Sequence, residues 1–266
     1  MLFDIDGTLV RPGSEIQRRH MGAMAAAVAE VTGSAEEFVY RDNGLSYGGV
    51  DLSGFTDAGT IAVALRLQGW PDTDINAALP QVVALMAKEL DAGGTVPADE
   101  DLLPGTVELV RGTVEGSTRI GLSTGNARAV ANWKMRCTGL ADALRDGGFG
   151  DGARRRAEVV VAAVAALADG RPYRGVVVGD TVSDVSAAHA AGLRCLAVST
   201  GGTSAAELTA AGADAVLPRL DDKAARAVLG ELLAGARTAR PPAPGPPPGG
   251  TGAGSDGDRI TIPGGR

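Results

Sequence analysis

Two aspartates stand one residue apart near the start of the chain, in the segment Asp4–Thr8, which reads DIDGT after a short apolar run. In a β-strand, side chains at positions i and i+2 point to the same face, so Asp4 and Asp6 would lie side by side. Two close carboxylates repel each other unless one takes up a proton or a cation lies between them. The pair therefore indicates a metal-assisted active site or, as the simpler alternative, a strand that ends in a solvated Asp–Gly turn.

Two later apolar segments also end in polar residues. The run Arg119–Ser123 precedes Thr124–Asn126, and the run Gly175–Gly179 precedes Asp180, with Asp184 one helical turn further on. Ligands of an open α/β sheet bind at the carboxyl ends of its strands. If these strands are neighbours, carboxylates, a hydroxyl and a helix N-terminus converge there. Hard oxygen ligands suit Mg²⁺, and a helix N-terminus suits a phosphate.

The elements that must position these residues fall into two regions. Residues 104–237 alternate between helices, expected at 106–115, 126–137, 157–168, 183–191 and 204–211, and strands, expected at 119–123, 175–179, 195–198 and 213–217. This alternation predicts right-handed βαβ units and a parallel sheet, which the N-terminal strand would join. Residues 14–98 predict only helices, at 17–31, 56–68 and 72–90, with no strand pattern.

Four parts of the chain resemble, in order, the four motifs of the haloacid dehalogenase superfamily. These parts are Asp4–Thr8, Ser123–Asn126, Lys134 and Gly179–Asp184. They look most like its phosphoglycolate phosphatase-like branch. The resemblance covers nearly the whole chain up to residue 237 and implies the fold. That fold is an α/β protein whose Rossmann-like parallel sheet core, from 1–12 and 101–237, carries an inserted α-helical cap at 13–100.

The resemblance also implies roles for the carboxylates. Asp4 would be the nucleophile that forms an aspartyl-phosphate, and Asp6 the general acid and then the general base. Asp4, the Asp6 backbone carbonyl and Asp180 would hold Mg²⁺, with Asp184 acting directly or through water. The presence of Asp6 favours phosphoester hydrolysis, because the dehalogenase members of the family lack this second aspartate.

The implied phosphate-binding residues are Thr124, Gly125, Asn126 and Lys134. Thr124 and Lys134 would also act in catalysis, because the hydroxyl would contact a phosphoryl oxygen and the ammonium would neutralise crowded negative charge. Ser123 competes with Thr124 for the motif hydroxyl, but the apolar run before it makes Thr124 the better fit.

Other polar residues have two interpretations. Thr56 and Asp57 form either a helix cap or, in the cap of this family, a substrate contact. Arg156, the last of three consecutive arginines, is expected on a solvated helix face but could approach an anionic substrate. His20 and His189 are expected to be structural or superficial.

The composition of the chain argues against some classes of partner and indicates a cellular location. A net charge of −7 without a basic stripe argues against nucleic acid, and no apolar stretch is long enough to cross a bilayer. Cys137 and Cys195 predict free thiols in a cytoplasmic protein, since their spacing fits no metal site. Residues 238–266, rich in proline and glycine, predict a disordered tail. Only three residues precede Asp4, which predicts an upstream start or a shortened first strand.

The predicted function is therefore Mg²⁺-dependent hydrolysis of a small phosphorylated metabolite. One alternative is a phosphomutase of the β-phosphoglucomutase type, which would use the same residues. A phosphonate hydrolase would need a cap lysine for a Schiff base, and the cap offers only Lys88. The third alternative is a non-catalytic binding protein with this fold. The sequence does not indicate the oligomeric state.

Overall fold

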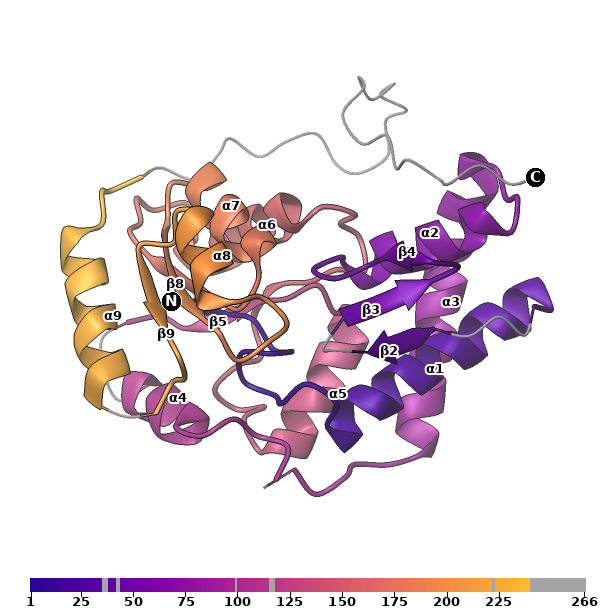
Figure 1. Cartoon of the computed structure of the whole chain (residues 1–266), viewed down its shortest axis with the longest axis horizontal. Coiled ribbons are helices and arrows are strands. Elements are labelled where there is room, and N and C mark those ends of the chain that lie inside the picture. The colour runs from indigo at the N-terminus through magenta and orange to yellow at the C-terminus, as the bar shows by residue number, and fades with distance from the viewer. Residues whose placement is uncertain (35–37, 42–43, 99, 115–117, 222, 240–266) are drawn as a thin grey trace.

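The computed structural model describes residues 1–34, 38–41, 44–98, 100–114, 118–221 and 223–239 (Figure 1). A six-stranded sheet in the order β6-β5-β1-β7-β8-β9 forms the centre of this part of the chain, and each of its strand pairs is parallel. Its strands are β1 (Leu2–Phe3), β5 (Gly121–Ser123), β6 (Gly147–Gly148), β7 (Val176–Gly179), β8 (Arg194–Val198) and β9 (Ala215–Leu217). The predicted parallel sheet is thus confirmed.

Helices cover both faces of the sheet, because successive side chains of its strands point to opposite sides. Val178 packs into a core with one helical layer, whereas Val177 packs into a second core with the other. The first layer contains α4 (Thr106–Val114), α5 (Arg128–Thr138) and α9 (Lys223–Gly235). The second contains α6 (Arg156–Ala168), α7 (Val182–Ala190) and α8 (Ala205–Ala210).

Every helix and strand expected between residues 104 and 237 is present, with ends shifted by up to about two residues. Neither β6 nor α9 was expected from the sequence. β6 is a Gly–Gly pair, Gly147–Gly148, and carries no side chain whose alternation would reveal a strand. Its backbone nevertheless pairs with β5 and extends the sheet by one strand.

Residues 13–100, called the insertion below, contain the three expected helices, α1 (Glu15–Thr32), α2 (Asp57–Leu67) and α3 (Asp72–Ala92). These helices pack against one another, and α1 and α3 also contact α5. In Figure 1 the insertion, indigo to purple, lies on the right, next to α5. The chain leaves and returns along paired backbone, since Arg11 N donates to Asp101 O (2.7 Å) and Leu103 N to Leu9 O (2.9 Å).

The expectation that the insertion contains no strand is wrong. β2 (Val39–Arg41), β3 (Gly44–Tyr47) and β4 (Val50–Asp51) form an antiparallel sheet. These strands are too short for a clear alternating pattern. Gly48 and Gly49, with φ of 54° and 79°, form the hairpin turn that joins β3 to β4. The Gly–Gly pair between Tyr47 and Val50 was the available sequence signal.

No helix in the ranges given above is long and apolar enough to cross a membrane. Cys137 and Cys195 are free thiols, as expected. Near the end of the described chain, Ala239 exchanges two backbone hydrogen bonds with Tyr173, at 2.9 and 2.7 Å. Residues 240–266, which make up nearly all of the expected tail, lie outside the described residues.

Gly148 tests the packing of α6 on the sheet edge. A Cβ at this position would lie 1.9 Å from Val159 O, so Gly148→Ala must push α6 away from β6. We expect urea unfolding to show a loss of about 1–3 kcal/mol or more in the free energy of unfolding. Gly152→Ala is the matched control, because a Cβ there meets no atom within 4 Å. Equal stability of the two variants would contradict this packing.

Candidate active site

The carboxyl ends of three neighbouring strands carry the predicted site residues. Phe3 of β1 pairs with Leu122 of β5 on one side and with Val178 of β7 on the other, so the three strands end at the same level. Asp4 continues this register, because its backbone N–H donates to Val178 O (2.9 Å). The order of the strands therefore brings together segments that lie more than a hundred residues apart in the sequence.

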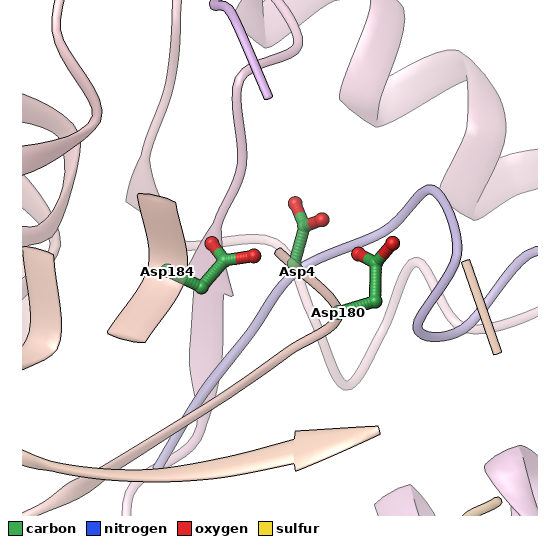
Figure 2. A group of neighbouring side chains, drawn as sticks. All are labelled: Asp4, Asp180 and Asp184. Atoms are coloured by element: carbon green, nitrogen blue, oxygen red, sulfur yellow. The ribbon is translucent and has the colours of Figure 1, made fainter. Parts of the chain in front are cut away.

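Asp4, Asp180 and Asp184 form a buried acidic triad (Figure 2), in which one carboxylate oxygen from each lies within 4.8 Å of the others. Desolvation and the nearby charge of Asp184 raise the pKa of Asp4 to about 6, and the charge of Arg156 offsets only part of this rise. Desolvation and the charge of Asp4 also raise the pKa of Asp180 well above its ordinary value. Three converging carboxyl groups, with the pKa values of Asp4 and Asp180 raised, offer hard oxygen ligands that fit a divalent cation such as Mg²⁺.

Close backbone approach holds Asp180 in this triad. Gly7 has a φ of 77°, and a Cβ on it would lie 2.3 Å from Asp180 Oδ2. A Cβ on Gly201 would lie 1.7 Å from the same oxygen. The glycine of the DIDGT segment is thus required both by the left-handed turn and by the carboxylate beside it.

Arg156 lies inside the site, so its expected place on a solvated helix face is wrong. Its side chain is 8% exposed, and Nη2 lies 2.6 Å from Asp4 Oδ1 and 2.6 Å from Asp184 Oδ1. Desolvation acts to lower the pKa of Arg156, but Asp184 and Asp4 outweigh it and raise that pKa. Three consecutive arginines look alike in sequence, and only the start of α6 turns the last one towards β1.

Asp184 has both of its oxygens engaged by protein donors. Oδ1 accepts from Arg156 Nε (2.7 Å), and Oδ2 accepts from Thr181 N (3.2 Å) and Thr181 Oγ1 (2.7 Å). The residue therefore belongs to the acidic triad and also forms the capping box of α7. Its geometry fixes Arg156 and suits an indirect contact with a metal better than a direct one.

Lys134 pairs with Asp6 rather than with Asp4. Its fully buried Nζ lies 2.6 Å from each carboxylate oxygen of Asp6, and Asn126 Nδ2 donates to Asp6 Oδ2 (2.9 Å). Desolvation acts to raise the pKa of Asp6, but the charge of Lys134 outweighs it and lowers that pKa. The two aspartates of the DIDGT segment thus have separate cationic partners.

The loop after β5 adjoins these carboxylates. Thr124 Oγ1 accepts a hydrogen bond from Asn126 N (3.2 Å), whereas the buried Ser123 Oγ has no hydrogen-bond partner in the described part of the chain. Gly125 and Asn126 line a cavity of about 710 Å³ together with Asp4, Asp6 and Asp180. The structure therefore brings Gly125 and Asn126 to the same cavity as the acidic triad, whereas Thr124 and Lys134 are fully buried and are not among the residues that line it.

Thr56 and Asp57 attach the insertion to this loop. Asp57 N donates to Gly125 O (2.7 Å), and Asp57 Oδ2 accepts from Ala127 N (2.7 Å) at the start of α5. Thr56 Oγ1 caps α2 by accepting from Gly59 N (3.0 Å). Asp57 lines the cavity and Thr56 is fully buried beside it, so the pair links α2 to the loop after β5.

His20 also lies at this site, whereas the sequence indicated only a structural or superficial role for it. It is 1% exposed, lines the cavity from α1, and has Nε2 3.2 Å from Asp57 Oδ2. A single histidine in an Ala-rich helix carried no sequence signal for this position. His189 is half-exposed, 3.0 Å from Asp214.

A family model for haloacid dehalogenase-like hydrolases matches residues 1–192. The chain therefore belongs to the haloacid dehalogenase-like hydrolases. No protein with a curated description matches the sequence.

Solved structures agree with this fold. CbbY from Rhodobacter sphaeroides in complex with phosphate is 24% identical, with a TM-score of 0.55 over 83% of this chain and 94% of that one. A hydrolase from Pseudomonas syringae is 18% identical, with a TM-score of 0.55 over 89% and 98%. A β-phosphoglucomutase from Clostridium difficile is 13% identical, with a TM-score of 0.54 over 83% and 90%.

Removing Arg156 is expected to destabilise the protein strongly. Arg156→Ala leaves Asp4 and Asp184 buried without their counter-charge, so urea unfolding in EDTA should show a loss of about 3–5 kcal/mol. Arg155→Ala is the matched control, because the Arg155 side chain is 71% exposed and its loss should change stability by less than about 0.5 kcal/mol. Similar stability of the two variants would contradict the buried ion pairs.

The raised pKa of Asp4 predicts a pH-dependent response to Mg²⁺. Without metal, the folded protein keeps a proton on Asp4 that the unfolded chain has lost, so stability falls as pH rises from 3.8 towards about 6. A cation bound to the ionised triad opposes this loss. We expect thermal unfolding to show a Mg²⁺-induced rise in Tm that is small at about pH 5 and several degrees at about pH 7.5.

Asp180→Asn should abolish that rise in Tm, because it removes a carboxylate of the triad. Asp169→Asn is the control, since Asp169 is 77% exposed by side chain and asparagine tolerates its positive φ of 53°. A Tm rise that is the same in both variants would place the cation elsewhere.

Proposed function

We propose that this protein is a Mg²⁺-dependent phosphatase that hydrolyses a small phosphorylated metabolite through an aspartyl-phosphate on Asp4. The observation that carries the proposal is the separate pairing of the two aspartates at the floor of one cavity, Asp4 with Arg156 and Asp6 with Lys134. Such a division suits two carboxylates with different tasks. Membership of the hydrolase family and the phosphate in the CbbY structure support the same chemistry.

In the first half-reaction, Asp4 attacks phosphorus. Arg156 holds Asp4 Oδ1, which leaves Oδ2 to form the new O–P bond. The bond between phosphorus and the leaving oxygen breaks as Asp6 gives that oxygen a proton. Gly125 N–H, the Thr124 hydroxyl and Lys134 stabilise the charge that develops on the phosphoryl oxygens.

In the second half-reaction, water attacks the same phosphorus. Asp6 takes the proton of that water, the bond between phosphorus and Asp4 breaks, and inorganic phosphate leaves. Asp6 must carry a proton in the first half-reaction, whereas Lys134 lowers its pKa in the substrate-free site. An incoming phosphate competes for Lys134 Nζ, weakens that pairing, and so favours the protonated form of Asp6.

Mg²⁺, held by Asp4, the Asp6 carbonyl and Asp180 with Asp184 behind them, would neutralise phosphoryl charge. The insertion would act as the cap of this site. Its contacts through Asp57 would close the cavity against bulk water while the phosphoryl group moves. A cytoplasmic location remains a prediction from the sequence.

There are two alternative functions. A phosphomutase differs in the acceptor of the phosphoryl group, and a phosphonate hydrolase differs in the leaving group. A phosphomutase would return the phosphoryl group to a sugar, and the likeness to a β-phosphoglucomutase keeps this as the second candidate. A phosphonate hydrolase is disfavoured, because Lys88 is exposed on α3 and is not among the cavity-lining residues.

Phosphate release from a panel of phosphomonoesters tests the proposal. We expect release that requires Mg²⁺, stops with EDTA, and falls at least about a thousandfold in Asp4→Asn, because the nucleophile is lost. Asp169→Asn should retain the wild-type rate. Transfer of phosphate between substrates without net release would favour the phosphomutase. Release that persists in Asp4→Asn would rule out Asp4 as the nucleophile.

A further inference from the structure

We infer that the preferred substrates are phosphomonoesters whose leaving group is uncharged and hydroxylated, and that His20 pairs with a leaving-group hydroxyl. The inference deepens the proposed function and rests on it. The inference rests on the residues that line the wall of the cavity away from the acidic triad. If phosphorus faces Asp4, the leaving group must lie against these residues.

His20 is a buried polar group of that wall. The residue is 1% exposed and lines the cavity, yet neither Nδ1 nor Nε2 has a hydrogen-bond partner within the described residues. Nε2 lies 3.2 Å from Asp57 Oδ2 but out of line for a hydrogen bond. A buried ring without partners is unfavourable until a ligand supplies them.

The hydrogen-bonding groups of the His20 ring determine which ligand groups can pair with it. A neutral imidazole has one N–H donor and one acceptor nitrogen, and a hydroxyl group likewise both donates and accepts. A carboxylate or a second phosphate offers acceptors only. Hydroxyl groups therefore satisfy His20 in either tautomer.

Charge on the cavity wall disfavours a second anionic group. Asp51, Asp57 and Glu207 line the cavity outside the acidic triad. Among the described lining residues the one Lys or Arg is Arg156, which is already paired with Asp4 and Asp184. An added phosphate or carboxylate would face like charge without a free counter-charge.

Other residues of this wall are uncharged, and they include both apolar and polar side chains. Met21, Met24 and Leu52 provide apolar contact, while Gln17 and Ser46 offer further polar groups. At about 710 Å³, the cavity is large enough for a leaving group of several carbon atoms beside the phosphate. Polyol and sugar monophosphates combine these properties.

Four substrates separate the parts of the inference. Glycerol 3-phosphate has hydroxyls, propyl phosphate lacks them, and 3-phosphoglycerate adds a carboxylate to a similar three-carbon chain. The fourth substrate, p-nitrophenyl phosphate, reports phosphatase activity without a hydroxyl. We expect kcat/KM with Mg²⁺ to be highest for glycerol 3-phosphate among the three-carbon esters and lowest for 3-phosphoglycerate.

His20→Ala should lower kcat/KM for glycerol 3-phosphate by about 10- to 100-fold, since one paired polar contact is lost. The values for propyl phosphate and p-nitrophenyl phosphate should change little. His20→Gln, which keeps a donor and an acceptor, should restore part of the loss and guards against misfolding of the alanine variant. His189→Ala is the matched control, because His189 is a half-exposed histidine on α7.

Equal or faster turnover of 3-phosphoglycerate overturns the inference about charge. A His20→Ala loss that is equal for all four substrates overturns the pairing with a hydroxyl. Either result leaves the phosphatase intact, because p-nitrophenyl phosphate still releases phosphate. No release from any of the four overturns the proposed function and this inference with it.

Discussion

The rest of the structure depends on how four carboxylates are accommodated at one end of a parallel sheet. Asp4, Asp6, Asp180 and Asp184 meet there because β1 lies between β5 and β7 and α7 begins directly after β7. Repulsion among them would oppose folding unless each had a compensating charge. Arg156 at the start of α6 compensates Asp4 and Asp184, and Lys134 of α5 compensates Asp6. Within the described residues, Asp180 receives one side-chain hydrogen bond, a long one from Thr8 Oγ1 (3.4 Å), so its carboxylate remains available to a cation.

This distribution of charge also sets the resting protonation state. In the protein alone, desolvation raises the pKa of Asp4, whereas Lys134 lowers that of Asp6. A phosphatase needs the reverse, an ionised nucleophile and a protonated acid. A divalent cation beside Asp4 favours its ionised form, and a phosphate that draws Lys134 away from Asp6 favours the protonated one. In the proposed mechanism, the loaded site would thus acquire the required order of pKa values, and Asp4 would stay a weak nucleophile until both ligands are bound.

The sequence predicted the sheet and the acidic residues well, because both leave local signals. Strand–helix alternation indicated the elements from residue 104 onward except β6 and α9, and strand ends marked Asp4, Asp180 and the loop after β5. Arg156 and His20 left no such signal, since their roles come from neighbours distant in sequence. The pairing of Arg156 with Asp4 spans β1 and α6, and the approach of His20 to Asp57 depends on how α1 packs against α2.

Asp57 would connect the proposed recognition of the leaving group to the loop after β5. Its backbone N–H and carboxylate bind Gly125 and Ala127 on either side of Asn126, while the same carboxylate lies 3.2 Å from His20. Asn126 in turn donates to Asp6. A displacement of the insertion that moved α2 would break the bonds to this loop, and a substrate that engaged His20 would favour keeping them. Binding energy from the non-reacting part of the substrate would then hold the loop and Asp6 in place during the reaction. Binding energy used in this way raises the rate of reaction and not only the affinity for substrate.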